Sequence, residues 1–518
     1  MPTRHTRLRS VPPVLASVCT FALEGVRGHR VTVEVDVRPG LPAFTLVGLP
    51  DRAVRESRER VRAAVLNSGL EFPLKRLTVN LAPAHVRKAG PGFDLAIAVA
   101  LLAASAQVPA PALAGIALWG ELSLSGELRP VRGALAAALG ARDAGYHRLV
   151  VPHHDAAEAA LVDGVAVIGA FNLGGIADLL HGRERPEPAL PAEELVADGP
   201  SAPDLRDVRG QGDAKRALEI AAAGGHNLLM VGPPGAGKTM LARRLAGILP
   251  PPSFDEALEI TQMHSAAGLG CGRLARQRPF RAPHHTISAP GLVGGGAHPR
   301  PGEVTLAHRG VLFLDELPEF ARVALDALRQ PLEEGRVEIM RGQRALDFPA
   351  NVMLVAACNR CPCARPGDRC LCGTADRDRY LRRLSGPLLD RIDLVCQIEP
   401  VPPVELVRGA PSGPGSEATR ERVVAARDLQ RARLRGTGVL CNADMDGRLT
   451  RAHVTVGRRL AGRMLDADNR SHLSGRGHDR VLRVARTIAD LGGRERVGFS
   501  DVGEALSYRL DGWERLAA

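Results

Sequence analysis

The chain has 518 residues, which exceeds what one hydrophobic core can organise and indicates about three domains. With 45% hydrophobic and 24% charged residues it can bury such cores, which excludes a disordered chain. Its longest apolar run, LAIAVALLAA from Leu95, is about half the length that crosses a bilayer. Nine cysteines, an odd number, argue against a disulfide framework. We therefore expect a cytoplasmic protein without a membrane span.

The formal net charge is +11, from 68 Lys and Arg against 57 Asp and Glu. An excess of that size favours a polyanionic partner such as nucleic acid, although charge alone does not identify one. The excess is mostly arginine, since Lys75, Lys88, Lys215 and Lys238 are the only lysines. A genome rich in G and C would produce the same bias, so the arginine content itself carries little information.

The first region, residues 1–183, alternates strand-like runs with apolar helix-like stretches, which predicts an α/β domain. Within it VTVEVDV at 31–37 has the period-two alternation of a half-buried strand. Residues 184–203 are rich in proline and acidic side chains and predict a linker.

A second α/β domain is predicted for residues 204–401, and it carries most of the motifs that indicate chemistry. Residues 402–518 then place Leu, Val and Ala at helical spacing among Arg and Asp, which predicts a helical C-terminal region. The predicted fold class is therefore α/β in the first two domains, followed by a helical domain.

A nucleotide site is predicted where the apolar strand HNLLMV runs into a glycine loop and a helix. Backbone N–H groups of such a loop surround phosphate oxygens, and the helix N-terminus adds partial positive charge. Lys238 would reach the β and γ phosphates of ATP, and Thr239 would bind Mg²⁺. The loop consists of Gly232, Pro233, Pro234, Gly235, Ala236, Gly237, Lys238 and Thr239.

Two carboxylates follow a second apolar strand, GVLFLDELPEF. Asp315 is expected to hold hydrated Mg²⁺ and Glu316 to polarise the attacking water. A further apolar strand, NVMLVAACN, would place Asn359 beside the γ phosphate and the water. Paired with the glycine loop, these strand ends indicate ATP hydrolysis.

Arg391 precedes one more strand, in SGPLLDRIDLVCQI. An arginine there does not easily fold back onto its own nucleotide, but it can reach a neighbour's across a subunit interface, as arginine fingers do. The alternative is an ordinary salt bridge with Asp390 or Asp393.

Five of the nine cysteines fall between residues 358 and 372. Two Cys-x-Cys pairs flank a turn containing Pro and Gly, so four thiolates can converge on tetrahedral Zn²⁺. Such a site would brace a loop that is poor in apolar residues. Free reduced thiols and redox sensing are the alternatives. The four candidate ligands are Cys361, Cys363, Cys370 and Cys372.

These motifs resemble those of AAA+ ATPases of the magnesium-chelatase-like class, and most closely the ComM (YifB) family. The resemblance extends from about residue 15 to 510. It implies a homohexameric ring that uses ATP for DNA branch migration in natural transformation or recombination, with recombination proteins as partners. It also implies that Asn359 is sensor 1, Arg391 the arginine finger and Arg483 sensor 2, with Arg480 as the competitor. The stretches that carry it are GLPDRAVRESRERVRAAVLNSG, GPPGAGKTMLARRL, PFRAPHHTISAPGLVGGG, PGEVTLAHRGVLFLDELPEF, SGPLLDRIDL and LSGRGHDRVLRVARTIADL.

By the same resemblance, two inserts point towards a ring pore. The second, GRVEIMRGQRALDF, alternates like a hairpin that turns at Gly342 and Gln343, so Arg341 and Arg344 could press onto a phosphate backbone. An edge hairpin with solvated charges is the alternative. The first insert, residues 278–303, contains His284 and His285, which would contact a substrate or a metal or be satisfied within the loop.

The first domain resembles the Lon protease domain, but the catalytic pair is missing. Gly92 stands where the nucleophilic serine would be, and Leu135 stands at the lysine position. Neither supplies a nucleophile or a base, so we expect a scaffold or interaction module and structural roles for Lys88 and Asp94.

Two other functions compete with a DNA motor. One is a chelatase-like ATPase that remodels a partner protein for metal insertion, against which the fused first domain argues. The other is a scaffold that binds ATP without turning it over, against which Glu316 and Arg391 argue.

Overall fold

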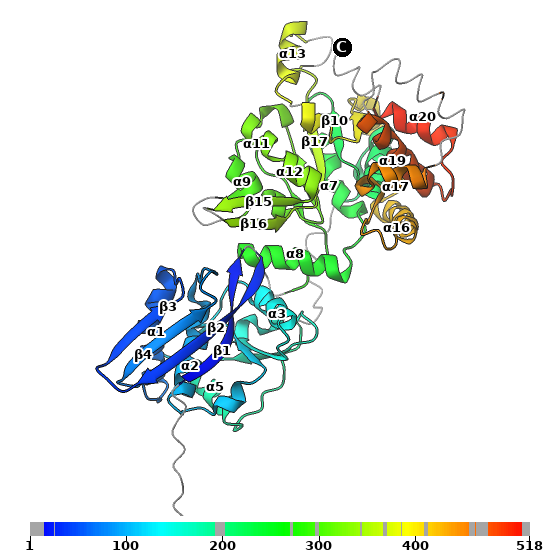
Figure 1. The fold of residues 1–518 in the computed structure, drawn as a ribbon. Helices are drawn as coiled ribbons and strands as arrows, with labels where there is room; N and C mark the ends of the chain where they lie inside the picture. The colour runs from blue at the N-terminus through cyan, green and yellow to red at the C-terminus, as the bar shows by residue number, and fades with distance from the viewer. Residues whose placement is uncertain are drawn as a thin grey trace, which may run out of the picture. The chain divides into compact units, whose positions relative to one another are not determined.

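The computed structural model describes residues 15–24, 26–191, 203–269, 273–295, 300–341, 344–365, 370–384, 386–408, 413–454, 462 and 475–509. The chain forms two compact units (Figure 1). The first comprises residues 1–197 with 261–274, and the second comprises 198–260 with 275–518. Among the described residues we find no helix whose length and apolar character would let it cross a membrane.

The first unit is built on a seven-stranded mixed sheet, in the order β3-β4-β2-β1-β5-β8-β9. The predicted strand at 31–37 lies within β2, where Val31, Val33, Val35 and Val37 are buried and the residues between them are half-exposed, so that prediction is confirmed. The strands are β1 (Leu15–Glu24), β2 (Arg27–Arg38), β3 (Ala43–Val47), β4 (Arg76–Ala82), β5 (Ile116–Leu118), β8 (Arg148–Pro152) and β9 (Ala166–Ala170), with a separate pair β6 (Glu121–Leu122) and β7 (Leu128–Arg129).

Helices of the first unit connect these strands. One of them, α2, is buried at every position, which is why LAIAVALLAA is apolar on all sides and shows no amphipathic period. The helices are α1 (Arg52–Asn67), α2 (Asp94–Ala104), α3 (Ala134–Asp143), α4 (His153–Ala159) and α5 (Leu173–Leu180), and the short 3-10 turns are η1 (Pro91–Phe93) and η2 (Ala110–Leu113).

Gly92 lies against the ring of Trp119. A Cβ added at Gly92 would lie 2.6 Å from two ring carbons, so the position leaves no room for a serine. Leu135 is fully buried. Asp94 is buried as well and accepts hydrogen bonds from Arg60 Nε at 2.6 Å and from Ser57 Oγ. Burial raises the pKa of Asp94, against the pairing with Arg60 and Ser57 that lowers it, and the contacts are those of a structural carboxylate.

The second unit is built on a five-stranded parallel sheet, in the order β11-β14-β17-β10-β18. The four longer strands are wholly or almost wholly buried, as expected for a parallel sheet covered by helices on its faces. The strands are β10 (Leu228–Val231), β11 (Phe280–Arg281), β14 (Val311–Leu314), β17 (Met353–Cys358) and β18 (Leu394–Gln397), with two hairpins, β12 (Gly294–Gly295) with β13 (Arg300–Pro301) and β15 (Arg336–Arg341) with β16 (Arg344–Pro349).

Helices follow each strand and then form the C-terminal region, as the sequence predicts. One hydrophobic core joins α6, α7, the sheet and the C-terminal helices α16, α19 and α20. The helices are α6 (Gly212–Gly224), α7 (Lys238–Ile248), α8 (Phe254–Ala267), α9 (Ala289–Val293), α10 (Glu303–Leu306), α11 (Arg322–Ala327), α12 (Arg329–Glu334), α13 (Thr374–Leu381), α14 (Gly386–Leu389), α15 (Pro403–Arg408), α16 (Ser416–Arg433), α17 (Gly447–His453), α19 (Gly475–Leu491) and α20 (Phe499–Ser507), and the 3-10 turns are η3 (Leu205–Asp207), η4 (Leu317–Glu319) and η6 (Asn442–Asp444).

The described structure thus matches the predicted fold class, with one difference in the assignment of residues. Residues 261–274 group with the first unit, where Gln262 Nε2 donates to the carbonyl of Val26 at 2.6 Å. The sequence places them inside the 204–401 domain, because contacts with segments distant in the sequence, such as that of Gln262 with Val26, leave no local periodic signal. Of the predicted linker, residues 192–202 lie outside the described residues.

Candidate nucleotide-binding site

The glycine loop lies between β10 and α7. Gly235 and Gly237 have φ of +76° and +94°, a left-handed backbone that L side chains rarely adopt. Gly232 is required for a different reason, because a Cβ there would lie 2.2 Å from the carbonyl oxygen of Ile398. These glycines allow the backbone to fold tightly at the N-terminus of α7, which is the arrangement that binds phosphate.

Lys238 begins α7 and turns back over this loop. Its Nζ donates to the carbonyls of Gly232 at 2.7 Å and Pro233 at 2.9 Å, and to Asn359 Oδ1 at 3.1 Å. Partial burial lowers its pKa, against the neighbouring Asp315, which raises it. The Lys238 ammonium therefore donates only to uncharged oxygens beside Asn359. Negatively charged phosphate oxygens would accept these hydrogen bonds more strongly, so a bound phosphate would replace them.

Thr239 and Asp315 face each other next to Lys238. Thr239 Oγ1 donates to Asp315 Oδ2 at 2.6 Å, and the other oxygen of Asp315 accepts from the backbone N–H of Glu316 at 2.9 Å. A hydroxyl and a carboxylate at this separation are ligands that Mg²⁺ prefers, so the residues fit the metal that accompanies ATP. Bound there, Mg²⁺ would neutralise charge on the phosphates.

Glu316 has φ of +54°, a left-handed conformation that costs a non-glycine residue roughly 1–2 kcal/mol. Its carboxylate is 55% exposed and lies with Oε2 3.3 Å from Nδ1 of His285. A residue with a strained backbone and an exposed carboxylate, at the end of a buried strand, is more consistent with a functional role than with packing. The sequence did not predict its contact with His285.

The order of the sheet explains why these residues meet. Asp315 and Asn359 follow β14 and β17, and the glycine loop follows β10, which neighbours β17. Carboxyl ends of parallel strands share one edge of a sheet. The sequence-predicted site residues at strand ends are therefore brought together, with hydrogen bonds linking Lys238 to Asn359 and Thr239 to Asp315.

Arg391 lies at the opposite edge, because it precedes β18 rather than following it. A four-residue strand separates the two edges by about 13 Å. Its guanidinium pairs with Glu333 of α12, and not with Asp390 or Asp393, the two partners that the sequence offers. Burial, followed by the charges of Arg476 and Arg483, lowers its pKa.

A cavity of about 800 Å³ opens at this amino edge. It is bordered by the residues that precede the strands, among them Asn227, Gly310, Val352 and Asp393. Eight arginines line it, against five carboxylates, so its walls carry a positive excess. The arginines are Arg278, Arg309, Arg391, Arg427, Arg431, Arg476, Arg480 and Arg483, and the carboxylates are Glu256, Glu333, Glu334, Asp393 and Asp444.

The two candidates for sensor 2 differ in their surroundings. Arg480 is 4% exposed and its Nε lies 3.5 Å from Asp393 Oδ1. Arg483 is half-buried and donates to the carbonyl of Ala443 at 2.6 Å, a neutral partner. The charge of the Arg483 guanidinium is therefore less neutralised by its partner than that of Arg480, which leaves Arg483 better able to pair with an anionic ligand. Like Arg391, it lines the cavity at the amino edge.

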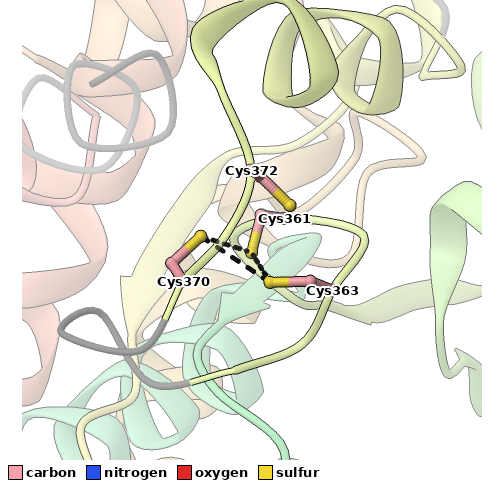
Figure 2. Close-up of side chains that lie close together, drawn as sticks. All are labelled: Cys361, Cys363, Cys370 and Cys372. Atoms are coloured by element: carbon pink, nitrogen blue, oxygen red, sulfur yellow. Dashed lines mark hydrogen bonds between the residues drawn. The ribbon is translucent and has the colours of Figure 1, made fainter.

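The four cysteines of the predicted zinc site converge (Figure 2). Cys361 Sγ lies 3.4 Å from Cys363 Sγ and 3.5 Å from Cys370 Sγ, and all four sulfurs lie within 4.8 Å of one another. Zinc bonds of about 2.3 Å in a tetrahedron require sulfurs about 3.8 Å apart. Backbone N–H groups of Arg365 and Leu371 lower the pKa of Cys363 to about 6, whereas burial raises the pKa of Cys361 and of Cys372, so support for the metal site comes from the convergence of the sulfurs and not from the pKa values of the thiols.

The predicted hairpin with Arg341 and Arg344 is present, since β15 pairs with β16 and these two residues form its last paired position. Its turn at Gly342 and Gln343, and the side chains of both arginines, lie outside the described residues. In the first insert, His284 Nδ1 hydrogen-bonds to Thr286 Oγ1 at 2.9 Å, as a satisfied loop histidine would.

One residue beside the glycine loop escaped prediction. Gln211 has φ of +57° and its side-chain amide donates to the carbonyls of Ala236, at 3.3 Å, and Glu399, at 2.6 Å. It also borders a cavity of about 490 Å³ between the start of α6 and the start of α16. In the sequence, Gln211 stands between Gly210 and Gly212 directly before a predicted helix, and this pattern could have indicated a tight turn beside the glycine loop.

The sheet, the glycine loop and the carboxylates at its edge have the arrangement of a P-loop nucleotide-binding domain, and the family models place the chain in the magnesium-chelatase-like AAA+ class. A family model described as magnesium chelatase, subunit ChlI matches residues 204–406. Two further models, subunit ChlI of Mg-chelatase and magnesium chelatase, subunit ChlI C-terminal, match residues 33–155 and 413–509.

Full-length relatives narrow this class. An uncharacterized protein YifB of Salmonella typhimurium is 45% identical over 96% of this chain and 97% of its own length. The competence protein ComM of Haemophilus influenzae is 43% identical over 96% of this chain and 97% of its own length. A Lon protease 2 of Thermus thermophilus is 30% identical over 24% of this chain and 16% of its own length. The chain belongs to the ComM/YifB family of magnesium-chelatase-like proteins.

Proposed function

We propose that this protein is an ATP-hydrolysing ring motor, a homohexamer, that remodels DNA during recombination or natural transformation. The observation that carries the proposal is the separation of Arg391 and Arg483 from the glycine loop of the same chain. Both line a basic cavity at the amino edge of the sheet, whereas Lys238 lies at the carboxyl edge. A second copy that presents its triphosphate to this cavity would give both arginines an anionic partner.

The chemistry assigned to the site is cleavage of the bond between the γ phosphorus and the β–γ bridging oxygen. Asn359 orients a water, Glu316 accepts its proton as the water oxygen attacks phosphorus, and Lys238 stabilises charge on the phosphate oxygens. Arg391 of the adjacent subunit adds positive charge as the leaving group departs. Its pairing with Glu333 is one that a triphosphate, carrying more charge, would displace.

DNA is proposed as the substrate on three grounds. The net charge of +11 suits a polyanion. A hairpin ends at Arg341 and Arg344. One full-length relative is named a competence protein.

Metal insertion by a chelatase-like ATPase is the other candidate function. The first domain no longer argues against it, because a model described as a chelatase subunit matches residues 33–155.

The rate of ATP hydrolysis with and without DNA separates these candidates. We expect single-stranded or branched DNA to raise the rate several-fold, because engaged pore loops favour the closed interface. Binding should weaken steeply as salt rises from about 50 to 200 mM, since phosphate contacts release counterions. If neither DNA changes the rate and neither binds at low salt, the DNA motor is excluded.

We also propose that Cys361, Cys363, Cys370 and Cys372 hold a structural zinc ion. Support comes from the convergence of their sulfurs and from the place of the loop, which begins directly after Asn359. A closed metal site would fix the position of that asparagine.

Metal analysis tests the zinc proposal. Purified protein should contain about one zinc per chain, and Cys361→Ser and Cys370→Ser should each lose it, because three thiolates bind zinc more weakly than four. Cys441→Ser is the matched control, since Cys441 is buried elsewhere and its thiol donates to Asp444 at 3.0 Å. Equal zinc in all four proteins would exclude these ligands.

A further inference from the structure

We propose that Asn227 is a positioning residue for Arg391, because it fastens the backbone of that arginine to β10 and β17. The inference rests on the proposed function, in which Arg391 acts on the nucleotide of a neighbouring subunit. It assigns a role to an asparagine directly before β10, outside the glycine loop and the carboxylates that follow the strands.

The side chain of Asn227 joins the strands on either side of β10. Its Oδ1 accepts from the backbone N–H of Leu354 in β17 at 2.8 Å, and its Nδ2 donates to the backbone carbonyl of Arg391 at 2.9 Å. Because β17 and β18 both pair with β10, this one amide reaches from β17 to the segment that leads into β18. An amide offers both an acceptor and a donor, whereas an ionised carboxylate has no donor.

The backbone of Asn227 holds the same segment. Its carbonyl accepts from the N–H groups of Asp393 and Leu394, both at 3.0 Å, and its N–H donates to Asp393 Oδ2 at 3.1 Å. Asp393 is buried, so water competes little for these bonds. With the bond to the Arg391 carbonyl, four hydrogen bonds from one residue fix the chain from Arg391 to Leu394.

Arg391 lies between two short elements, which explains why it needs this support. It follows α14, a helix of four residues, and it precedes the start of β18. Its N–H donates to the carbonyl of Leu388 at 2.9 Å, as in the last turn of a helix. Its own carbonyl points beyond that helix, and the Asn227 amide supplies the partner.

A fixed backbone matters because the guanidinium is carried on a long and flexible side chain. It pairs with Glu333 and is 18% exposed at the border of the basic cavity. To reach a neighbour's phosphate it must leave Glu333 and still arrive at one position. A misplacement of about 1 Å can cost about 10²-fold in rate. Loss of the Asn227 amide should therefore act through Arg391, and not on nucleotide binding at the glycine loop.

A change of the donor alone tests this role. Asn227→Asp keeps an acceptor oxygen but cannot donate to Arg391, so its kcat should fall roughly 10- to 100-fold while KM for ATP changes less than about twofold. Asn227→Ala, which adds no charge beside Asp393, should behave alike. Asn67→Asp is the matched control, since Asn67 Nδ2 also donates to a backbone carbonyl, that of Leu124 at 2.7 Å in the first unit. Its kcat should stay within about twofold of wild type.

Mixed assemblies show on which side of an interface the defect lies. With Glu316→Gln, whose Arg391 and Asn227 are intact, about one interface in four joins a working nucleotide site to an undisturbed arginine. Roughly a quarter of wild-type activity should then return. With Arg391→Ala, every interface lacks an undisturbed arginine, so activity should not rise above that of Asn227→Asp alone. Recovery with Arg391→Ala only would place the defect at the nucleotide-binding edge and overturn the inference.

Two further results would contradict the role of Asn227. One is a near-normal kcat in Asn227→Asp. The other is loss of ATP binding or of assembly in both Asn227 variants, because the hydrogen bonds would then hold the sheet together rather than orient Arg391. The mixture of Glu316→Gln with Arg391→Ala is the reference. If it stays inactive, the proposed action between subunits fails first, whereas its recovery without recovery of Asn227→Asp by Glu316→Gln refutes only the role of Asn227.

Discussion

Glu316→Gln should abolish ATP turnover, with a loss of roughly 10²–10⁴-fold in kcat, while ATP binding and ring assembly stay intact. The amide keeps the shape of the carboxylate but cannot accept a proton from water. Because Asp315, Thr239 and Lys238 are untouched, the affinity for ATP should change little. Single-turnover hydrolysis and nucleotide binding measured on the same preparation separate the two effects.

Glu319→Gln is the matched control for this change. Glu319 lies three residues further on, in η4, and pairs with Arg383 at 3.0 Å on the surface, where a lost ion pair costs little. Its turnover should remain close to wild type. A Glu316→Gln protein with near-normal kcat would mean that another group activates the water, and the assignment of Glu316 would have to be withdrawn.

Much of the nucleotide site could be predicted from the sequence because its residues lie at the ends of strongly apolar strands. Buried parallel strands appear as short apolar runs, and the residue after each run must lie at the carboxyl edge. Lys238, Asp315 and Asn359 are placed by that rule, and hydrogen bonds link Lys238 to Asn359 and Thr239 to Asp315. The cysteine cluster was predictable for a related reason, since its two pairs are close in sequence and a short turn brings them together.

Residues that meet through distant segments could not be predicted in this way. Glu333 comes from α12 and Arg483 from α19, so nothing near Arg391 in sequence reveals its partner or its cavity. His285 follows β11, a strand of two residues, which is too short to give a periodic signal. Its place beside β14, and hence beside Glu316, depends on sheet order and not on local pattern.

The positions of the arginines constrain how a ring could work. Under the proposed function, Glu316 and Asn359 act on the nucleotide bound by their own chain, whereas Arg391 and Arg483, which line the cavity at the amino edge of the sheet, act on a neighbour's. A single subunit would then hold two incomplete halves of different sites. Under the proposed function, turnover requires an interface, and isolated subunits should hydrolyse ATP slowly if at all.

Arg391→Ala should reduce turnover by about 10³-fold in pure assemblies, because the charge that stabilises the leaving group is lost. The fold should survive, since the partner Glu333 is 48% exposed and tolerates the loss of its ion pair. ATP affinity should fall less than kcat. Arg379→Ala, which removes an arginine that is 79% exposed on α13, is the control and should leave turnover unchanged.

Mixing variants decides whether Arg391 acts on a neighbour. Arg391→Ala keeps an intact glycine loop and Glu316, and Glu316→Gln keeps an intact arginine, so neither is active alone. When equal amounts assemble together, about one interface in four pairs an intact Glu316 with an intact Arg391, and roughly a quarter of wild-type activity should return. An arginine that served its own nucleotide would leave every mixed interface inactive. Recovery on mixing therefore requires action between subunits, and mixed assemblies that form but stay inactive would refute it.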